Sequence, residues 1–361
     1  MNIVYVSHLS GASYAGPTYS VPRQIAAQAK YDNVFWYNAV KIVNEEWKRL
    51  SYYHDLYEYP SESISMLPEP YNNPDLVIVE QFYNMTRSRI RNELIKRDIP
   101  YIIIPRGELT KQAQARKRVK KRIANLLFCM RFARKAAAIQ YLTMQEYADS
   151  GNRWNKNHVI IPNGIDIPSQ KKVGSISDGI KCISIGRIEP YQKGLDLLID
   201  ACASIRDLLA RTQCTITICG PDKENKKEQL REAINEAGLS QLVFLREGVY
   251  GKEKEELLLQ SDVYLMTSRF EGHPMALIEA MSYGIPCVVT TGSNMRNEVE
   301  LYDAGWVADV NAMSIATALS NMIAEKSLIS SKAENAARLS KEYDWDNIAK
   351  ISSQQFRETI F

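Results

Sequence analysis

Short apolar runs alternate with longer amphipathic stretches along almost the whole chain. In the first half these runs lie at residues 3–6, 34–37, 76–79, 101–104, 137–142 and 159–161, and in the second half at residues 182–185, 215–219, 242–245, 263–266, 287–291 and 306–308. Brief apolar runs between helix-like segments are typical of buried strands in parallel sheets. The alternation therefore predicts an α/β protein with two doubly wound, Rossmann-like sheets.

Two segments interrupt this pattern. Residues 40–72 are rich in Tyr, Glu and Ser and have no clear period, so no function is assigned to them beyond acceptor recognition as an open alternative. Residues 169–179 are rich in Lys, Ser and Gly, as expected for a linker, and they follow the junction Pro162-Asn163-Gly164-Ile165-Asp166. The sequence thus predicts one domain over residues 1–165 and a second over residues 166–343.

Composition narrows the class of protein. The chain has 361 residues and a formal net charge of +3. Its six cysteines, at positions 129, 182, 202, 214, 219 and 287, lack the spacing of metal ligands, which favours reduced, buried thiols in a cytoplasmic protein. No apolar run reaches transmembrane length, and the first residues, MNIVYVSHL, lack the basic start of a signal peptide.

The stretch from Ser268 to Thr290 combines a loop, a helix, a turn and a strand. Pro274 suits a helix start, where its missing N–H costs nothing, and Gly284 suits the left-handed residue that closes the helix. Glu279 lies among apolar residues of this helix, so its carboxylate needs hydrogen-bond donors. A second carboxylate, Glu271, precedes it by eight positions, just before the helix.

This arrangement suits a sugar nucleotide. Free N–H groups at a helix start favour a phosphate, the carboxylate of Glu279 could accept two ribose hydroxyls, and the carboxylate of Glu271 could reach a second sugar. A plainer alternative is a helix with a paired, solvated Glu at each end, and the pattern of residues alone leaves both open.

The string Glu271-Gly-His-Pro-Met-Ala-Leu-Ile-Glu279-Ala-Met-Ser-Tyr-Gly284-Ile-Pro286 resembles the hallmark of the retaining GT-B glycosyltransferases of glycosyltransferase family 4. The resemblance is specific over residues 181–292 and loose before residue 160. It implies the GT-B architecture, with two doubly wound Rossmann-like domains facing a cleft. Residues 1–165 would bind the acceptor, residues 166–343 the nucleotide-sugar donor, and a helix at about 344–361 would cross back to the first domain.

The resemblance also implies roles in the second domain. Glu271 would hold the donor sugar and Glu279 the ribose, while Arg187 and Lys193 would clamp the donor diphosphate. Two fixed cations stabilise the charge that builds on the leaving nucleoside diphosphate, so no metal and no other cofactor is expected.

The remaining donor contacts are carried over in the same way. The N–H groups after Pro274, in Met275 and Ala276, would cover the phosphate, and His273 would touch the sugar or the phosphate. The loop ending in Val249 would cup the base. Because this loop holds one extra residue compared with the family, the base stays open between a UDP- and a GDP-linked sugar.

In the first domain, Gly16 lies in the loop after the first strand and lets the backbone approach a ligand closely. That loop has neither the dinucleotide-binding nor the P-loop spacing, which argues against both classes. The resemblance places this loop, with His8, near the donor phosphate and acceptor, and Arg106 on the acceptor side. The alternatives are a plain turn, a satisfied loop histidine and a structural ion pair.

Residues 111–135 form the most basic stretch, with ten Lys or Arg and no acid. Apolar residues interrupt it at 123, 126, 127, 130 and 132, which predicts a basic amphipathic helical region. Such a region can lie on anionic lipid, although a solvated helix face on its own sheet explains it too. Nucleic acid is not favoured, because no reading motif accompanies the charge.

The predicted function is therefore transfer of a sugar to a saccharide or lipid-linked saccharide acceptor, in polysaccharide or glycoconjugate biosynthesis. The enzyme would be cytoplasmic, with a peripheral position on the inner face of the cell membrane as a further expectation. A non-catalytic scaffold that binds nucleotide sugar and a sugar-nucleotide epimerase on the same fold are the alternatives. Asp344-Trp345-Asp346 formally matches a metal-binding Asp-x-Asp but is expected to cap a helix.

Overall fold

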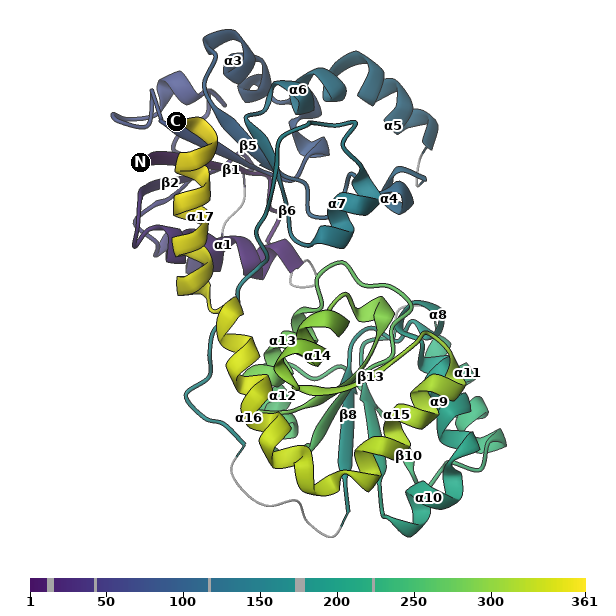
Figure 1. The fold of residues 1–361 in the computed structure, drawn as a ribbon. Coiled ribbons are helices and arrows are strands. Elements are labelled where there is room, and N and C mark those ends of the chain that lie inside the picture. The colour runs from purple at the N-terminus through teal and green to yellow at the C-terminus, as the bar shows by residue number, and fades with distance from the viewer. Residues whose placement is uncertain (12–15, 42–43, 116–117, 173–178, 223–224) are drawn as a thin grey trace. The chain divides into compact units, whose positions relative to one another are not determined.

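The computed structural model describes residues 1–11, 16–41, 44–115, 118–172, 179–222 and 225–361 (Figure 1). The chain divides into two compact units. The first consists of Met1–Gly164 together with Trp345–Phe361, and the second of Ile165–Asp344. The division lies one residue from the boundary expected between Ile165 and Asp166.

The first unit contains a seven-stranded parallel sheet in the order β3-β2-β1-β4-β5-β6-β7. Its strands are β1 (Asn2–Ser7), β2 (Asn33–Asn38), β3 (Tyr53–Asp55), β4 (Leu76–Glu80), β5 (Tyr101–Ile104), β6 (Ala138–Tyr141) and β7 (His158–Ile160). The strands β1 and β4 are neighbours, so the strand order reverses between them. Both faces of the sheet are apolar and buried, as continuous apolar runs require.

Helices cover both faces of this sheet. They are α1 (Gly16–Gln28), α2 (Glu45–Lys48), α3 (Arg89–Arg97), α4 (Lys111–Ala115), α5 (Arg118–Ala124), α6 (Met130–Lys135), α7 (Met144–Ser150) and α17 (Trp345–Ile360). The last helix, drawn in yellow, lies beside α1 (Figure 1). Its first turn is tied there by Asp346, which accepts bonds of 2.7 Å from Lys30 and 3.1 Å from Tyr31. This carboxylate therefore bonds residues that follow α1.

The second unit contains a six-stranded parallel sheet in the order β10-β9-β8-β11-β12-β13. Its strands are β8 (Lys181–Ile185), β9 (Thr215–Cys219), β10 (Val243–Arg246), β11 (Val263–Met266), β12 (Cys287–Thr290) and β13 (Gly305–Ala308). Its helices are α8 (Pro190–Lys193), α9 (Leu195–Ser204), α10 (Arg206–Arg211), α11 (Lys226–Glu236), α12 (Gly251–Leu259), α13 (Met275–Ser282), α14 (Arg296–Tyr302), α15 (Ala312–Ala324) and α16 (Ile329–Ser340). Two apolar clusters, one on each face, bury the sheet.

The structure adds detail to the sequence prediction in three places. Residues 53–55 form an edge strand that pairs with β2, although no element is predicted there. The stretch that follows Gly194 forms two helices, α9 and α10, because Ile205 leaves the helical conformation. The described residues of the basic region are helical, as predicted, and a π-helical turn at Asn125–Cys129 separates α5 from α6.

Candidate active site

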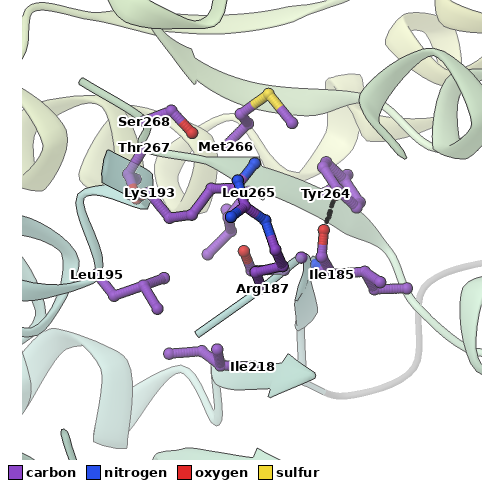
Figure 2. A pocket seen from close by; sticks show the side chains of 12 residues that line it. Ile185, Arg187, Lys193, Leu195, Ile218, Tyr264, Leu265, Met266, Thr267 and Ser268 are labelled. Carbon is purple, nitrogen blue, oxygen red and sulfur yellow. Dashed lines mark hydrogen bonds between the residues drawn. The ribbon is translucent and has the colours of Figure 1, made fainter. Parts of the chain in front are cut away.

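The site begins where the strand order of the second sheet reverses. β8 has β9 on one side and β11 on the other, and its ladder with β11 covers only two residue pairs. Beyond them, the Tyr264 hydroxyl donates a 2.9 Å bond to the Ile185 carbonyl and ties the two strand ends together (Figure 2). Open α/β sheets bind ligands at the carboxyl ends of strands where the order reverses.

A small pocket lies at this point, between the ends of β8 and β11. Residues 184–187, Lys193 and residues 264–268 supply most of its lining, and Figure 2 shows their side chains. The enclosed space is about 10 Å³, room for roughly one water molecule. The pocket alone is therefore too small to hold a nucleotide.

Two residues of the second unit that were predicted to contact different parts of a donor are bonded to each other. Lys193 Nζ lies 2.7 Å from Glu271 Oε1, and the side chains are 19% and 9% exposed. The Ser268 hydroxyl donates a 2.5 Å bond to the same carboxylate oxygen. Asn294 donates through Nδ2 to the Glu271 carbonyl. Glu271 is thus held at both its side chain and its backbone.

The backbone at Lys193 is fixed by a close approach between two segments. Lys193 ends α8, and Gly194 follows with φ of +61°. A Cβ at Gly194 would lie 2.0 Å from the Thr267 carbonyl oxygen. The Thr267 hydroxyl donates bonds of 3.1 Å to the carbonyls of Lys193 and Gly194. Only glycine fits here, so the segment that carries Lys193 packs directly against the end of β11.

Arg187 brings a second positive charge to the pocket. It lies two residues after β8, is exposed, and donates a 3.3 Å bond to the Gln192 side chain. The Lys193 side chain crosses the neighbouring Gly186, where an added Cβ would meet Lys193 Cε at 3.5 Å. In contrast, Arg269 is occupied by two bonds of 2.7 Å to Asp196. Arg187 and Lys193 are the two cationic residues in the lining of the pocket.

Glu279 lies on α13 and has the donor that its surroundings require. Lys254 Nζ, from α12, lies 2.6 Å from Glu279 Oε1, and the two side chains are 28% and 33% exposed. Lys254 was not among the site residues predicted from the sequence. Its spacing from the buried Leu258, four positions later on the same helix, was the available signal.

The start of α13 differs slightly from expectation. Pro274 is the N-cap residue and Met275 the first helical residue. The Met275 N–H donates to the His273 carbonyl at 3.0 Å and so is already bonded within the chain. His273 Nδ1 lies 3.0 Å from Met275 Sδ. The Ala276 N–H remains at the helix start, while Val249 is buried in the apolar cluster beneath.

In the first unit, Arg106 is held by a network of side chains. Its Nε lies 2.7 Å from Glu80 Oε2, and the two side chains are 6% and 0% exposed. Its other nitrogens donate to side chains of Asn163 at 3.0 Å, Gln24 at 2.8 Å and Ser20 at 3.2 Å. Of the two alternatives for Arg106, this geometry favours the structural ion pair.

The other two candidates of the first unit stand near the same strand ends. His8 follows β1, and burial lowers the pKa of its imidazole. Gly16 is the first residue of α1, and a Cβ there would meet no atom within 4 Å. Its loop falls partly on residues 12–15, which lie outside the described residues.

The basic region presents apolar side chains to solvent. Val119, Ile123 and Leu126 are 73%, 55% and 83% exposed. They follow one another at spacings of four and three residues. Phe132, by contrast, is buried in the core of the first unit. Of the apolar residues that the sequence grouped together here, some thus serve the core and others face outward.

Metal-binding clusters, disulfides and membrane-spanning helices are absent from the described residues. They contain no group of three or more His, Cys, Asp or Glu side chains that could hold a metal ion. All six cysteines are buried and free of disulfides. None of the helices in the described ranges has the length and apolarity that crossing a bilayer requires.

Comparison with known proteins gives one family. The sequence profile described as glycosyl transferases group 1 matches residues 166–342. The chain is 29% identical over 171 residues to the amylovoran biosynthesis glycosyltransferase AmsD of Erwinia amylovora, covering 47% of this chain and 46% of that protein. It is 31% identical over 127 residues to the GDP-mannose:cellobiosyl-diphosphopolyprenol alpha-mannosyltransferase of Xanthomonas oryzae, covering 35% and 32%. The chain thus spans less than half the length of these relatives.

Solved structures match over the entire chain. The HepE protein of Anabaena in complex with UDP superposes with a TM-score of 0.75, covering 99% of this chain and 100% of that one. The sequences are 16% identical, so this likeness concerns the fold. The predicted pair of Rossmann-like sheets in a GT-B fold is confirmed.

Proposed function

This chain belongs to the glycosyl transferases group 1 family, and on that premise we propose that it moves a sugar from a nucleotide sugar to a saccharide or lipid-linked saccharide, with retention at the anomeric carbon. The observation that carries the proposal is the ion pair of Lys193 and Glu271 beside Arg187, where the strand order reverses. A cation and a carboxylate in contact suit the diphosphate and the sugar of one donor, which are themselves adjacent.

Each charged side chain then has a role in the transfer. Arg187 and Lys193 bind the diphosphate and stabilise the negative charge that grows as the bond between the anomeric carbon and the phosphate oxygen breaks. The acceptor oxygen forms the new bond to that carbon, and its proton passes to the leaving phosphate. Glu271 accepts hydroxyl groups of the donor sugar, and Glu279 those of the ribose. These steps require no metal.

The uncharged contacts complete the donor site. The start of α13, with its Ala276 N–H, faces the phosphates, because helix starts favour anions. His273 contacts the sugar or the phosphate, and the backbone around Val249 supports the base. A UDP complex among the structural matches and a GDP-mannose enzyme among the relatives support UDP- and GDP-linked sugars as the two candidate donors.

The acceptor side of the proposal involves residues of the first unit. His8, Gly16 and Arg106 lie near the strand ends of the first unit, and Arg106 would act there by holding Glu80 and Asn163 in place. A relative named for a diphosphopolyprenol acceptor supports a lipid-linked saccharide, and one named for amylovoran biosynthesis supports polysaccharide assembly. A peripheral position at the inner face of the cell membrane would suit such an acceptor and the exposed apolar side chains of α5.

Ligand-induced melting shifts test this function. We would measure the melting temperature with UDP, GDP and ADP for the wild type and for Arg187→Ala/Lys193→Ala. A ligand at a hundredfold excess over its dissociation constant adds about 2.7 kcal/mol to the folded state, which raises the melting temperature by several degrees. We expect a shift with one nucleotide that disappears in the double variant.

The same nucleotide then directs the assay of transfer. Sugars linked to the base that binds would be screened for donor hydrolysis and for transfer. Nucleotide binding without any turnover would favour the scaffold alternative, and interconversion of free nucleotide sugars would favour the epimerase. Absence of a shift with all three nucleotides would contradict the proposed function.

A further inference from the structure

Within the proposed donor site, one cation has no role yet. Lys254 lies 2.6 Å from Glu279, the residue assigned to the ribose. Within the described part of the chain, no other side chain bonds this carboxylate. The pair joins α12 to α13 and lies outside the phosphate clamp of Arg187 and Lys193.

The position of Lys254 follows from helix packing. Lys254, Leu257 and Leu258 are spaced so that they share one face of α12. Leu258 is buried and Leu257 partly buried against an apolar cluster that also contains Leu277, Ile278 and Ala280 of α13. The same packing that seats α12 against this cluster therefore brings Lys254 to Glu279. Neighbouring Lys252, on another face, is 87% exposed and lies 3.8 Å from Glu256.

The geometry of the pair leaves room for a ligand. Lys254 bonds Oε1 of Glu279, and the carboxylate is one-third exposed, so its second oxygen can still meet solvent or a ligand. A carboxylate that must accept hydroxyl groups in a fixed direction binds more strongly when its rotamer is held beforehand. A surface pair with no such task would contribute little.

We propose that Lys254 is a positioning residue for ribose recognition: it fixes and charge-balances the Glu279 carboxylate so that its free oxygen accepts the ribose hydroxyls. This inference rests on the proposed function. It assigns the discrimination between ribose and deoxyribose to a pair of residues and not to Glu279 alone.

The test compares the affinities of UDP, GDP and ADP with those of their 2′,3′-dideoxy counterparts, measured by calorimetry on the full chain. For the base that binds, we expect the wild type to favour the ribose form by roughly ten- to a hundredfold, the range for hydrogen bonds to a charged group. Glu279→Ala and Lys254→Met should each reduce that ratio to about threefold or less. Affinity for the dideoxy nucleotide should stay unchanged.

Two further variants separate positioning from general damage. Lys254→Arg keeps the charge and should restore most of the ratio, while Lys252→Met removes a matched cation from the same helix and should leave it at the wild-type value. Because the Lys254 pair is partly exposed, Lys254→Met should melt close to the wild type.

The results that would contradict the role proposed for Lys254 can be told apart. A wild-type ratio in Lys254→Met would mean that the pair is only a surface ion pair. An equal loss of affinity for both sugar forms would mean that Lys254 contacts the phosphate or the base instead. Binding without any preference for ribose in the wild type would overturn the inference and leave the transferase proposal standing, whereas failure of every nucleotide to bind would overturn both.

Discussion

Lys193 Nζ and Glu271 Oε1 lie 2.7 Å apart, so the side chain assigned to the phosphates and the one assigned to the sugar share a bond. The two roles nevertheless predict different effects on nucleotide affinity and on transfer when each side chain is replaced. Lys193→Ala removes a charged partner of the diphosphate, and we expect nucleoside diphosphate affinity to fall by roughly ten- to a hundredfold. Glu271→Gln should bind the nucleotide within about threefold of the wild type and lose at least about a hundredfold in transfer.

Calorimetry with the nucleotide and an assay of donor consumption separate these effects. If Glu271→Gln weakens nucleotide binding as much as Lys193→Ala does, the carboxylate acts mainly by holding Lys193. In that case the role assigned to Glu271 at the donor sugar would be wrong.

A second prediction concerns Gly194, which follows Lys193 in the same segment. A Cβ there would overlap the Thr267 carbonyl, and φ is +61°. We expect Gly194→Ala to lower the free energy of unfolding by more than about 2 kcal/mol, the sum of backbone strain and displacement of the strand end. Gly272→Ala is the matched control, because a Cβ there meets no atom within 4 Å.

Urea unfolding followed by fluorescence measures both variants. The control should stay within about 0.5 kcal/mol of the wild type. Equal stability of the two variants would show that the approach between Gly194 and Thr267 can relax at little cost. Nucleotide affinity, measured in parallel, reports whether the Lys193 segment has moved.

Much of the fold could be predicted because the buried strands are continuous apolar runs. The runs at 76–79 and 101–104 lie in strands that are paired on both sides. Apolar runs of this length are too short to be buried helices. β3 could not be predicted in this way. Its three residues, Tyr53, His54 and Asp55, contain no apolar run, and they form a strand only because β2 offers them an edge.

The candidate site, like the fold, could be predicted only where a local sequence pattern marks the residue. Glu271, Glu279 and Lys193 stand in local patterns that the sequence displays, and the structure places Lys193 against Glu271. The partners of Glu279 and Arg106 come from distant segments. The spacing of Lys254 from Leu258 puts it on the packed face of α12 but does not identify its partner, and Arg106 meets Gln24, Glu80 and Asn163 only in the folded chain. Tertiary contacts, absent from any short window of sequence, decide these roles.

The buried pair of Arg106 and Glu80 gives a prediction on stability. Arg106→Ala leaves the fully buried Glu80 carboxylate without its counter-charge, which costs about 3–5 kcal/mol for such pairs. Replacing Glu80 as well, in Arg106→Ala/Glu80→Ala, should recover part of this loss because no charge stays buried. The exposed pair of Lys30 and Asp346 is the control, and Lys30→Ala should cost about 1 kcal/mol or less.

Chemical unfolding of the wild type and of these three variants decides whether Arg106 forms a structural ion pair or contacts the acceptor. A near-normal stability of Arg106→Ala, combined with loss of acceptor-dependent transfer, would make Arg106 an acceptor contact. A large loss of stability supports the structural role that the network indicates.

The lowered pKa of Asp32 leads to a prediction of how the stability of the protein depends on pH. Burial alone would raise the pKa of this carboxyl, but hydrogen bonds from the Met1 ammonium, Ser353 and Gln28 hold the pKa below its ordinary value of 3.8. The unfolded chain therefore takes up the proton first as the pH falls, and the stabilisation from Asp32, complete well above pH 3.8, is lost below it.

Asp32→Asn tests this sign. The variant should be less stable than the wild type by roughly 1–3 kcal/mol at pH 7, since an amide cannot accept all of these bonds. The difference should shrink as the pH falls below 4, because the wild type then loses the same contribution. A gap for Asp32→Asn that is independent of pH would contradict the assignment.

The exposed apolar side chains of the basic region predict binding to anionic lipid. Ile123 and Leu126 are 55% and 83% exposed within a stretch of ten cations and no acid. Burying such side chains in a bilayer interface gains about 0.8 kcal/mol per CH₂ group, and the cations add attraction to anionic headgroups that salt weakens. We expect Ile123→Ser/Leu126→Ser to bind vesicles containing phosphatidylglycerol at least about tenfold more weakly than the wild type.

The matched control changes two equally exposed apolar residues of the second unit, Leu301 and Met313, both 81% exposed. Leu301→Ser/Met313→Ser should sediment with these vesicles as the wild type does, and neither double variant should melt at a different temperature, because the replaced side chains face solvent. Binding by the wild type should weaken at high salt and with vesicles of phosphatidylcholine alone. Equal sedimentation of the two double variants would contradict a docking role for the basic region, and its cations would then serve only as a solvated face of the first unit.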